Sequence, residues 1–234
     1  MIRIQYKETL KKIAEEALEN VAENITIGLG SGYTVSKFVD VLSNYLMRTS
    51  LKVSVIPSSL QIQTFAENVG LKNIQPLLTR TIDLVIDGVD QLDKNLNMIK
   101  GGGGALLREK VLMRAAKKVV ILADEKKFTE VLSIKVPIEV IPFARVFVIK
   151  EIERIGGKPE LRKMKKNYPF FTDNGNIILD IDFGTISEPS LLLSKMKEIP
   201  GVVEVGIFIE RVHIIYYTCK DGSVEKIIPE VEIK

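Results

Sequence analysis

A glycine-rich segment with hydroxyl side chains is the first place in this sequence where residue types and spacing favour chemistry. It reads Gly28-Leu29-Gly30-Ser31-Gly32-Tyr33-Thr34. Glycines allow a tight turn, and the amides at a helix start attract an anion. Tyr33 or Val35 stands where the dinucleotide pattern G-x-G-x-x-G needs its third glycine, and no P-loop pattern occurs. We therefore expect a small phosphate to bind Ser31, Gly32, Tyr33 and Thr34, although a turn needed only for packing is an alternative.

A second segment places two carboxylates three residues apart, directly after an apolar run. It reads Asp87-Gly88-Val89-Asp90. Carboxylates at a strand end bind sugar hydroxyls, hold a metal, or only cap and turn the chain. The calcium-loop spacing is absent, and no histidines or cysteines cluster nearby in the sequence. We therefore predict hydroxyl recognition and no metal site.

A third segment joins a lysine and four glycines to a glutamate. Lys100 precedes residues 101–104, and Glu109 follows in a predicted helix. Four glycines at a helix start are entropically costly, so close approach to a ligand explains them better than flexibility does. Glu109 shares its helical stripe with apolar residues, and burial among them would favour a general base that works near neutral pH: Ala105, Leu112, Met113 and Ala116. The alternative is an ordinary helix charge paired with Lys110, with Arg114 or with solvent.

Two further residues carry weaker signals. Lys127 follows the apolar run 119–123, so its ammonium can reach the same edge of a sheet, unless it is simply solvated. His213 is the only histidine and lies in an apolar segment, so we interpret it as structural. No serine–histidine–aspartate set is evident.

Composition narrows the classes of protein. The 234 residues are 46% hydrophobic, and 33 basic against 30 acidic residues give a formal charge of only +3. The one dense basic run, residues 162–166, lacks interleaved aromatics, so we predict a solvated surface and no nucleic acid partner. There is no apolar run of 18 residues and no signal-peptide pattern, which predicts a cytoplasmic protein without membrane contact. Cys219 has no second cysteine for an internal disulfide.

The elements that must position these residues alternate between helices and strands. Apolar residues at three- and four-residue steps predict helices over 10–21, 35–46 and 105–117, and Ser58 or Ser59 begins another that Gly70 ends. Apolar runs predict strands over 25–29, 51–56, 82–86 and 119–123. This α/β pattern predicts a doubly wound, mainly parallel Rossmann-like sheet.

The pattern changes after Leu132. A strand over 136–141, a helix ending at 156–157, a hairpin turning at 173–176, a helix from Pro189 and a strand over 202–209 give the order β-α-β-β-α-β. That order predicts a smaller ferredoxin-like α+β domain. A terminal hairpin, 212–218 and 224–228, would return to the first domain. We expect a Rossmann-like domain of residues 1–132 plus 211–234 and a ferredoxin-like domain of residues 133–210.

Over nearly its whole length the sequence resembles the ribose-5-phosphate isomerase A family. The resemblance includes Ile141-Pro142 and the segment 199–203. Five motifs have the order and spacing of that family: Gly28-Leu29-Gly30-Ser31-Gly32, Asp87-Gly88-Val89-Asp90, Lys100-Gly101-Gly102-Gly103, Arg108-Glu109-Lys110 and Thr172-Asp173-Asn174-Gly175-Asn176.

The resemblance implies specific roles for these residues. Glu109 matches the proton acceptor, and Asp87, Asp90 and Lys100 would also act in catalysis. Substrate contacts would come from Ser31 to Thr34, Asp87 to Asp90, Lys100 to Gly103, and Lys127. The resemblance also implies a sugar-phosphate substrate, no metal or organic cofactor, and a homodimer or homotetramer.

Two positions depart from the family pattern, and two other functions remain open. Tyr33 stands where the family commonly has a small hydroxyl residue, which affects the expected phosphate contact. Gln91 stands directly after Asp90, where the family commonly has an acidic residue. The implied reaction converts ribose 5-phosphate to ribulose 5-phosphate through a cis-enediolate, as part of the non-oxidative pentose phosphate pathway. The alternatives are a non-catalytic sugar-phosphate sensor, which would not require Glu109, and an amino-sugar phosphate deaminase, for which His213 offers no obvious acid–base partner.

Overall fold

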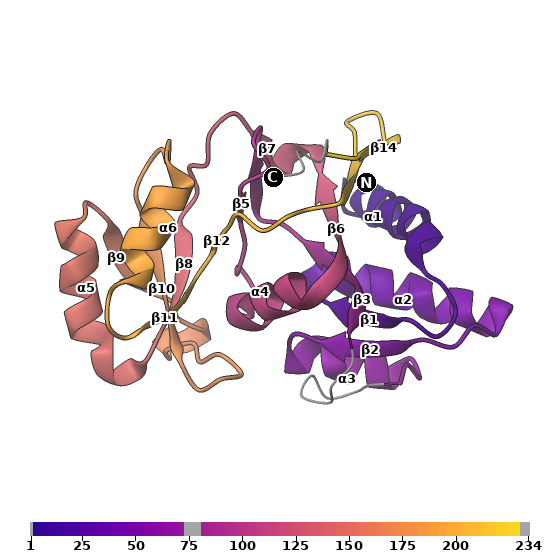
Figure 1. The fold of residues 1–234 in the computed structure, drawn as a ribbon, viewed down its shortest axis with the longest axis horizontal. Coiled ribbons are helices and arrows are strands. Elements are labelled where there is room, and N and C mark those ends of the chain that lie inside the picture. Colours follow the sequence, from indigo (N-terminus) through magenta and orange to yellow (C-terminus); the bar gives the residue numbers. More distant parts are fainter. Residues whose placement is uncertain (1, 73–80, 230–234) are drawn as a thin grey trace. The chain divides into compact units, whose positions relative to one another are not determined.

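The computed structural model describes residues 2–72 and 81–229, which form two compact units (Figure 1). The first unit contains the chain up to Gly88, Val111–Lys127 and the segment from Arg211 onward. The second contains Val89–Lys110 and Phe128–Glu210. Among the described residues, no helix is long and apolar enough to span a membrane.

A six-stranded, mainly parallel sheet organises the first unit. Its order is β14-β13-β6-β3-β1-β2. The strands are β1 (Thr26–Leu29), β2 (Ser54–Pro57), β3 (Ile82–Gly88), β6 (Ala116–Asp124), β13 (Ile214–Thr218) and β14 (Val224–Ile227). Every neighbouring pair is parallel except the antiparallel hairpin of β13 and β14. The predicted sheet is confirmed, and the terminal hairpin joins it as expected.

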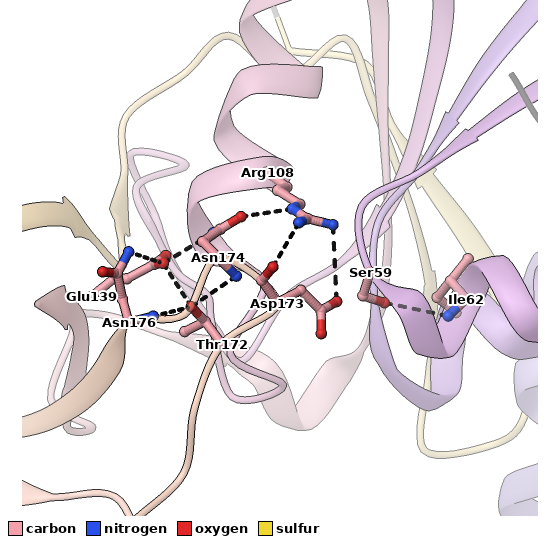
Figure 2. Close-up of polar contacts among 8 residues, drawn as sticks. All are labelled: Ser59, Ile62, Arg108, Glu139, Thr172, Asp173, Asn174 and Asn176. Carbon is pink, nitrogen blue, oxygen red and sulfur yellow. Dashed lines mark hydrogen bonds and ion pairs between the residues drawn. The ribbon is translucent and has the colours of Figure 1, made fainter. Parts of the chain in front are cut away.

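Helices cover both faces of this sheet because alternate strand residues point to opposite sides. Ile27 and Leu29 share a core with α1 (Ile2–Ala17), α2 (Gly32–Thr49) and α3 (Leu60–Asn68). Gly28 faces the other way: a Cβ added there would lie 3.5 Å from Leu112 Cβ in α4 (Leu106–Ala115). As predicted, a serine caps α3, since Ser59 Oγ accepts a hydrogen bond from the Ile62 amide at 3.3 Å (Figure 2).

The second unit contains the predicted ferredoxin-like arrangement. In chain order it consists of β8 (Val136–Val140), α5 (Arg145–Arg154), β9 (Lys158–Leu161), β10 (Ile177–Asp182), α6 (Pro189–Lys197) and β11 (Val202–Val205). The sheet order is β11-β8-β10-β9, and every neighbouring pair is antiparallel. One face packs on α5 and α6 through residues such as Ile138 and Leu179. The alternate residues, among them Glu139 and Asp180, belong to the other face.

A small third sheet in the second unit was not predicted. It has the order β12-β5-β4-β7 and consists of β4 (Gln91–Asp93), β5 (Met98–Ile99), β7 (Phe128–Thr129) and β12 (Ile207–Phe208). The expected single strand over 202–209 is therefore two strands, β11 and β12, in different sheets. This pairing groups residues 89–110 and 128–132 with the second unit, whereas the sequence-based division placed them in the first.

His213 has the structural role predicted for it. Its Nδ1 accepts a hydrogen bond from the Val119 amide at 3.0 Å, and its own amide donates to the Val119 carbonyl. An accepting Nδ1 requires the neutral imidazole. Burial lowers the pKa of His213, and the charges of Arg211 and Lys118 lower it further.

This lowered pKa predicts a specific pH dependence of stability. The unfolded chain, with a histidine pKa of about 6.5, takes up the proton before the folded chain does. The contribution of His213 to the free energy of unfolding is therefore complete above that pH and decreases as the pH falls through and below it. His213→Asn keeps an acceptor near the Nδ1 position but does not titrate. Urea unfolding between pH 8 and pH 5 should show a steeper loss of stability in the wild type than in His213→Asn, and parallel curves would contradict this role.

Candidate active site

The first group of candidate residues lies where the strand order of the large sheet reverses. From β1 the chain moves to β2 on one side and returns to β3 on the other. Ligands of open α/β sheets bind outside the carboxyl ends of the strands at such a switch point. The glycine-rich turn follows β1, and the Asp87-Gly88 dipeptide, which the sequence placed after a strand, forms the carboxyl end of β3.

These two segments are in direct contact within the first unit. The Gly30 amide donates to the Ile86 carbonyl at 2.9 Å. A Cβ built on Gly30 would lie 1.9 Å from Asp87 Oδ1, so glycine is required for the backbone to pass beside this carboxylate. Asp87 is 1% exposed, and its Oδ1 accepts from the Gly88 amide at 2.7 Å. Thr34 lies beside Gly88, since a Cβ added to Gly88 would lie 3.6 Å from Thr34 Cβ.

The close approach of Gly30 and Asp87 predicts that Gly30→Ala displaces the carboxylate. We expect a stability loss of about 1–3 kcal/mol from overpacking and at least about tenfold weaker sugar-phosphate binding or turnover, since a 1 Å displacement can cost ~10²-fold. Gly70→Ala is the matched control because a Cβ there meets nothing within 4 Å, although its φ of +79° adds strain. Thermal unfolding and titration with ribose 5-phosphate check the prediction. Equal binding by both variants would contradict it.

The other candidates of the first unit lie at the same edge of the sheet. Ser31 occupies the N-cap position of α2, and Gly32 follows it with a φ of +84°. Tyr33 is 45% exposed, and Lys37 Nζ lies 5.9 Å from its ring centroid. Lys127 ends the 3₁₀ turn after β6, whose direction is parallel to that of β3. The first unit therefore places the residues expected to bind the phosphate at the carboxyl ends of parallel strands.

In the second unit, the central feature is a buried ion pair. Lys100 Nζ lies 3.2 Å from Glu109 Oε2, and both side chains are 3% exposed. Lys100 follows β5, where its amide donates to the Gly206 carbonyl, and Glu109 extends from the first turn of α4. Glu109 is thus a buried carboxylate paired with Lys100 and not a solvent-exposed helix charge. A buried ionised pair is costly unless it is well paired, so its presence suggests a functional role.

The glycine run after Lys100 has two amides engaged within this unit, since the Gly104 amide donates to the Gly101 carbonyl at 2.9 Å and the Gly102 amide donates to Asp90. Asp90 Oδ2 accepts from the Gly102 amide at 2.8 Å, and the Asp90 amide donates to the Ile99 carbonyl. The Gly102 amide therefore already has an acceptor in the Asp90 carboxylate. Lys100, whose Nζ lies 3.2 Å from Glu109 Oε2, is a cation in direct contact with the candidate base. Val89, the remaining residue of the acidic segment, is 9% exposed.

Arg162 is a residue whose role the sequence interpretation missed. The basic run was predicted to be solvated, which is confirmed for the exposed Lys163, Lys165 and Lys166 but wrong for Arg162. Its guanidinium forms a two-point ion pair with Asp180 and donates to the carbonyls of Gly101 and Gly102 at 2.8 and 3.0 Å. The sequence signal was Asp180 between the apolar residues Leu179 and Ile181 of one strand. Arg162 therefore anchors the glycine run through the backbone carbonyls of Gly101 and Gly102.

Two neighbours further fix the Lys100–Glu109 pair. Lys110 is buried and donates to Glu204 Oε1 at 3.0 Å and to the carbonyls of Val205 and Ile207. Burial lowers the pKa of Lys110, and the Glu204 carboxylate opposes that shift. The Phe208 ring lies 5.4 Å from Lys100 Nζ and 4.5 Å from Lys110 Nζ. Both ammonium groups thus lie within cation–π distance of the same aromatic ring.

The donor set gives no indication of a metal site. Within residues 2–72 and 81–229, no group of three histidine, cysteine, aspartate or glutamate side chains is arranged to hold a metal ion.

Gln91, which departs from the family pattern, accepts from the Ser133 amide at 2.7 Å and the Ile134 amide at 3.2 Å. Gln91 therefore anchors a neighbouring loop.

Comparisons with known proteins agree with the resemblance seen in the sequence. A family model described as ribose 5-phosphate isomerase A (phosphoriboisomerase A) matches residues 54–222. Ribose-5-phosphate isomerase A of Methanosarcina acetivorans is 40% identical over 206 residues, covering 88% of this chain and 88% of that protein. The protein of the same name from Archaeoglobus fulgidus is 46% identical over 203 residues, covering 83% of this chain and 88% of that protein.

Solved structures give the same result at the level of the fold. A D-ribose-5-phosphate isomerase in complex with phospho-erythronic acid has a TM-score of 0.90 and 36% identity, covering 95% of this chain and 98% of that one. Ribose 5-phosphate isomerase from Plasmodium falciparum has a TM-score of 0.91 and 33% identity, covering 96% of this chain and 100% of that one. The similarity therefore extends over both units.

Proposed function

The chain belongs to the ribose 5-phosphate isomerase A family and interconverts D-ribose 5-phosphate and D-ribulose 5-phosphate, and we propose that Glu109 is the base that moves the proton. The observation that carries this assignment is the buried Lys100–Glu109 pair at 3.2 Å. A carboxylate held in a dry environment beside a cation is a suitable base for removing a proton next to a carbonyl group.

The proton transfer follows from this pair. Ribose 5-phosphate opens to its aldehyde, and Glu109 removes the C2 proton to give a cis-enediolate. When Glu109 takes up the proton it loses its charge, so the Lys100 ammonium becomes available to the negative oxygen of the enediolate. Glu109 then returns the proton to C1, and a second proton moves from O2 to O1. The product is ribulose 5-phosphate, and every step is reversible.

The other candidate residues bind and orient the sugar phosphate in this proposal. Ser31, Gly32, Tyr33 and Thr34 bind the phosphate at the start of α2, with Lys127 as an additional cation. Asp87 and Asp90 bind hydroxyls and exchange protons with them, Gly88 and Val89 supply backbone between them, and the run 101–103 lies against the sugar. The contact between Gly30 and Asp87 and the bond between Asp90 and Gly102 support these assignments.

Several broader features belong to the same proposal. The protein acts in the non-oxidative pentose phosphate pathway, in the cytoplasm, on a small sugar phosphate, and as a homodimer or homotetramer. It needs no metal or organic cofactor, and it has no nucleic acid or membrane partner. Size-exclusion chromatography with light scattering tests the oligomeric state.

An assay of chelator-treated protein tests the function itself. Conversion of ribose 5-phosphate to ribulose 5-phosphate that survives chelation supports the isomerase without a metal. Binding of ribose 5-phosphate without conversion would instead support a sugar-phosphate sensor. Release of ammonia from an amino-sugar phosphate would support a deaminase.

A further inference from the structure

A fully buried carboxylate organises the turn 172–176 of the second unit. Glu139 of β8 is 0% exposed. Its Oε1 accepts from Thr172 Oγ1 at 2.8 Å, from Asn174 Nδ2 at 2.9 Å and from Asn176 Nδ2 at 2.9 Å (Figure 2). Thr172 Oγ1 in turn accepts from the amides of Asn174 and Asn176. A buried charge is stable only when it is paired or hydrogen-bonded, so these donors and Glu139 depend on one another.

The same turn binds the residue next to the proposed base. Arg108 Nε donates to Asn174 Oδ1 at 2.8 Å, and Arg108 Nη2 donates to the Asp173 carbonyl at 2.9 Å (Figure 2). Arg108 Nη1 also lies 4.0 Å from Asp173 Oδ2. The side-chain amide of Asn174 thus makes two hydrogen bonds: its nitrogen donates to Glu139, and its oxygen accepts from Arg108. Glu139 therefore determines which atom of Asn174 is presented to Arg108.

Arg108 and Glu109 share the first turn of α4, which begins at Leu106. The start of a helix lacks part of its backbone hydrogen bonding, and the preceding glycine run does not stiffen it. Side-chain bonds from Arg108 to the turn therefore limit how far this part of the helix can move. Glu109, one residue on, is limited with it.

We propose that Glu139 and Asn174 are positioning residues for catalysis: they orient the turn 172–176, which holds Arg108 and thereby fixes the carboxylate of Glu109. This inference rests on the proposed function, because it assigns a role relative to the proton-transferring base. A displacement of about 1 Å in such a group can reduce the rate ~10²-fold. Phosphate binding by the first unit would not change, so the effect belongs in kcat and not in KM.

The chain offers a matched pair of variants. Asn174→Ala and Asn176→Ala each remove one side-chain hydrogen bond to Glu139 Oε1, but only Asn174→Ala also removes the acceptor of the hydrogen bond from Arg108 Nε. We expect kcat for ribose 5-phosphate to fall about 10- to 100-fold in Asn174→Ala, and less than threefold in Asn176→Ala, with KM within about twofold in both. In an Arg108→Leu background, Asn174→Ala should cause no further loss of kcat.

Each outcome of this experiment decides between roles. Equal kcat losses in both variants, or a loss of thermal stability without a loss of kcat, would overturn the positioning role and leave a structural one. A further loss of kcat in the Arg108→Leu background would show that Asn174 does not act through Arg108 and would also overturn it. Normal wild-type turnover in these assays keeps the proposed function intact, whereas a wild type without turnover would overturn the function and this inference together.

Discussion

Glu109→Gln is expected to lower kcat for ribose 5-phosphate by about 10²- to 10⁴-fold, the usual contribution of a positioned acid or base. Glutamine has the shape of glutamate and keeps an oxygen that can accept from Lys100, but it cannot take up the C2 proton. The protein should remain folded and should still bind the sugar phosphate, because the phosphate contacts are assigned to residues 31–34 of the first unit. Steady-state kinetics together with titration by ribose 5-phosphate check both parts.

A glutamate on the surface of the second unit, which also contains Glu109, provides the control. Glu160 is paired with Lys135, and its side chain is 68% exposed. Glu160→Gln should leave kcat unchanged, since exposed ion pairs contribute about 1 kcal/mol or less to stability and this one is not assigned to the site. If Glu109→Gln retained more than about a tenth of the wild-type kcat, Glu109 would not be the base.

The second large effect is expected at Lys100. Lys100→Met removes the cation from a pair in which both side chains are 3% exposed, and the charged Glu109 remains buried. Breaking a buried pair in this way typically costs about 3–5 kcal/mol of stability. Turnover should also fall by at least about 10²-fold, because in the proposed mechanism the Lys100 ammonium stabilises the negative enediolate oxygen. Urea unfolding and steady-state kinetics measure the two effects separately.

An exposed lysine shows whether burial causes the loss. Lys117 lies 2.8 Å from Asp83 Oδ1, but its side chain is 63% exposed. The same replacement, Lys117→Met, should cost about 1 kcal/mol or less and leave kcat unchanged. If Lys100→Met were as stable and as active as Lys117→Met, Lys100 would neither balance the charge of Glu109 nor assist the reaction.

Strong hydrophobic periodicity made most of the architecture predictable. The central strands β3 and β6 are covered on both faces, so they appear in the sequence as near-continuous apolar runs, 82–86 and 119–123. The strand that contains Val136, Ile138 and Val140 and the regular alternation of elements after it were enough to predict the ferredoxin-like unit. Element ends shifted by a few residues, as for β2, which begins at Ser54 and not at Leu51.

Very short strands could not be predicted in this way. β5, β7 and β12 have two residues each, too few for any periodicity. They pair with segments distant in the sequence, and that pairing groups residues 89–110 with the second unit. The expected strand over 202–209 is interrupted after Val205, and the residues that follow pair with a different sheet. Local residue types do not indicate this change of partner.

Residues of the candidate site were predictable where they follow strands. Asp87 and the turn around Gly30 lie together because the sheet places the ends of β1 and β3 side by side. The residues that bind the segments around the candidate site, and do not belong to it themselves, were harder to predict. Glu139 and Asp180 lie on the face of the sheet β11-β8-β10-β9 opposite its helices, and their partners lie 18 to 37 residues away in sequence. A polar residue at an alternate strand position was the available signal.

Deuterium incorporation from heavy water tests the central claim most directly. If Glu109 transfers a proton through an enediolate, the wild-type enzyme should introduce solvent deuterium into the sugar phosphate at the carbon that is reprotonated, as observed by NMR. Glu109→Gln should show neither this exchange nor conversion, and Glu160→Gln should match the wild type. Deuterium incorporation and conversion by Glu109→Gln at the wild-type rates would contradict the assignment of Glu109 as the base.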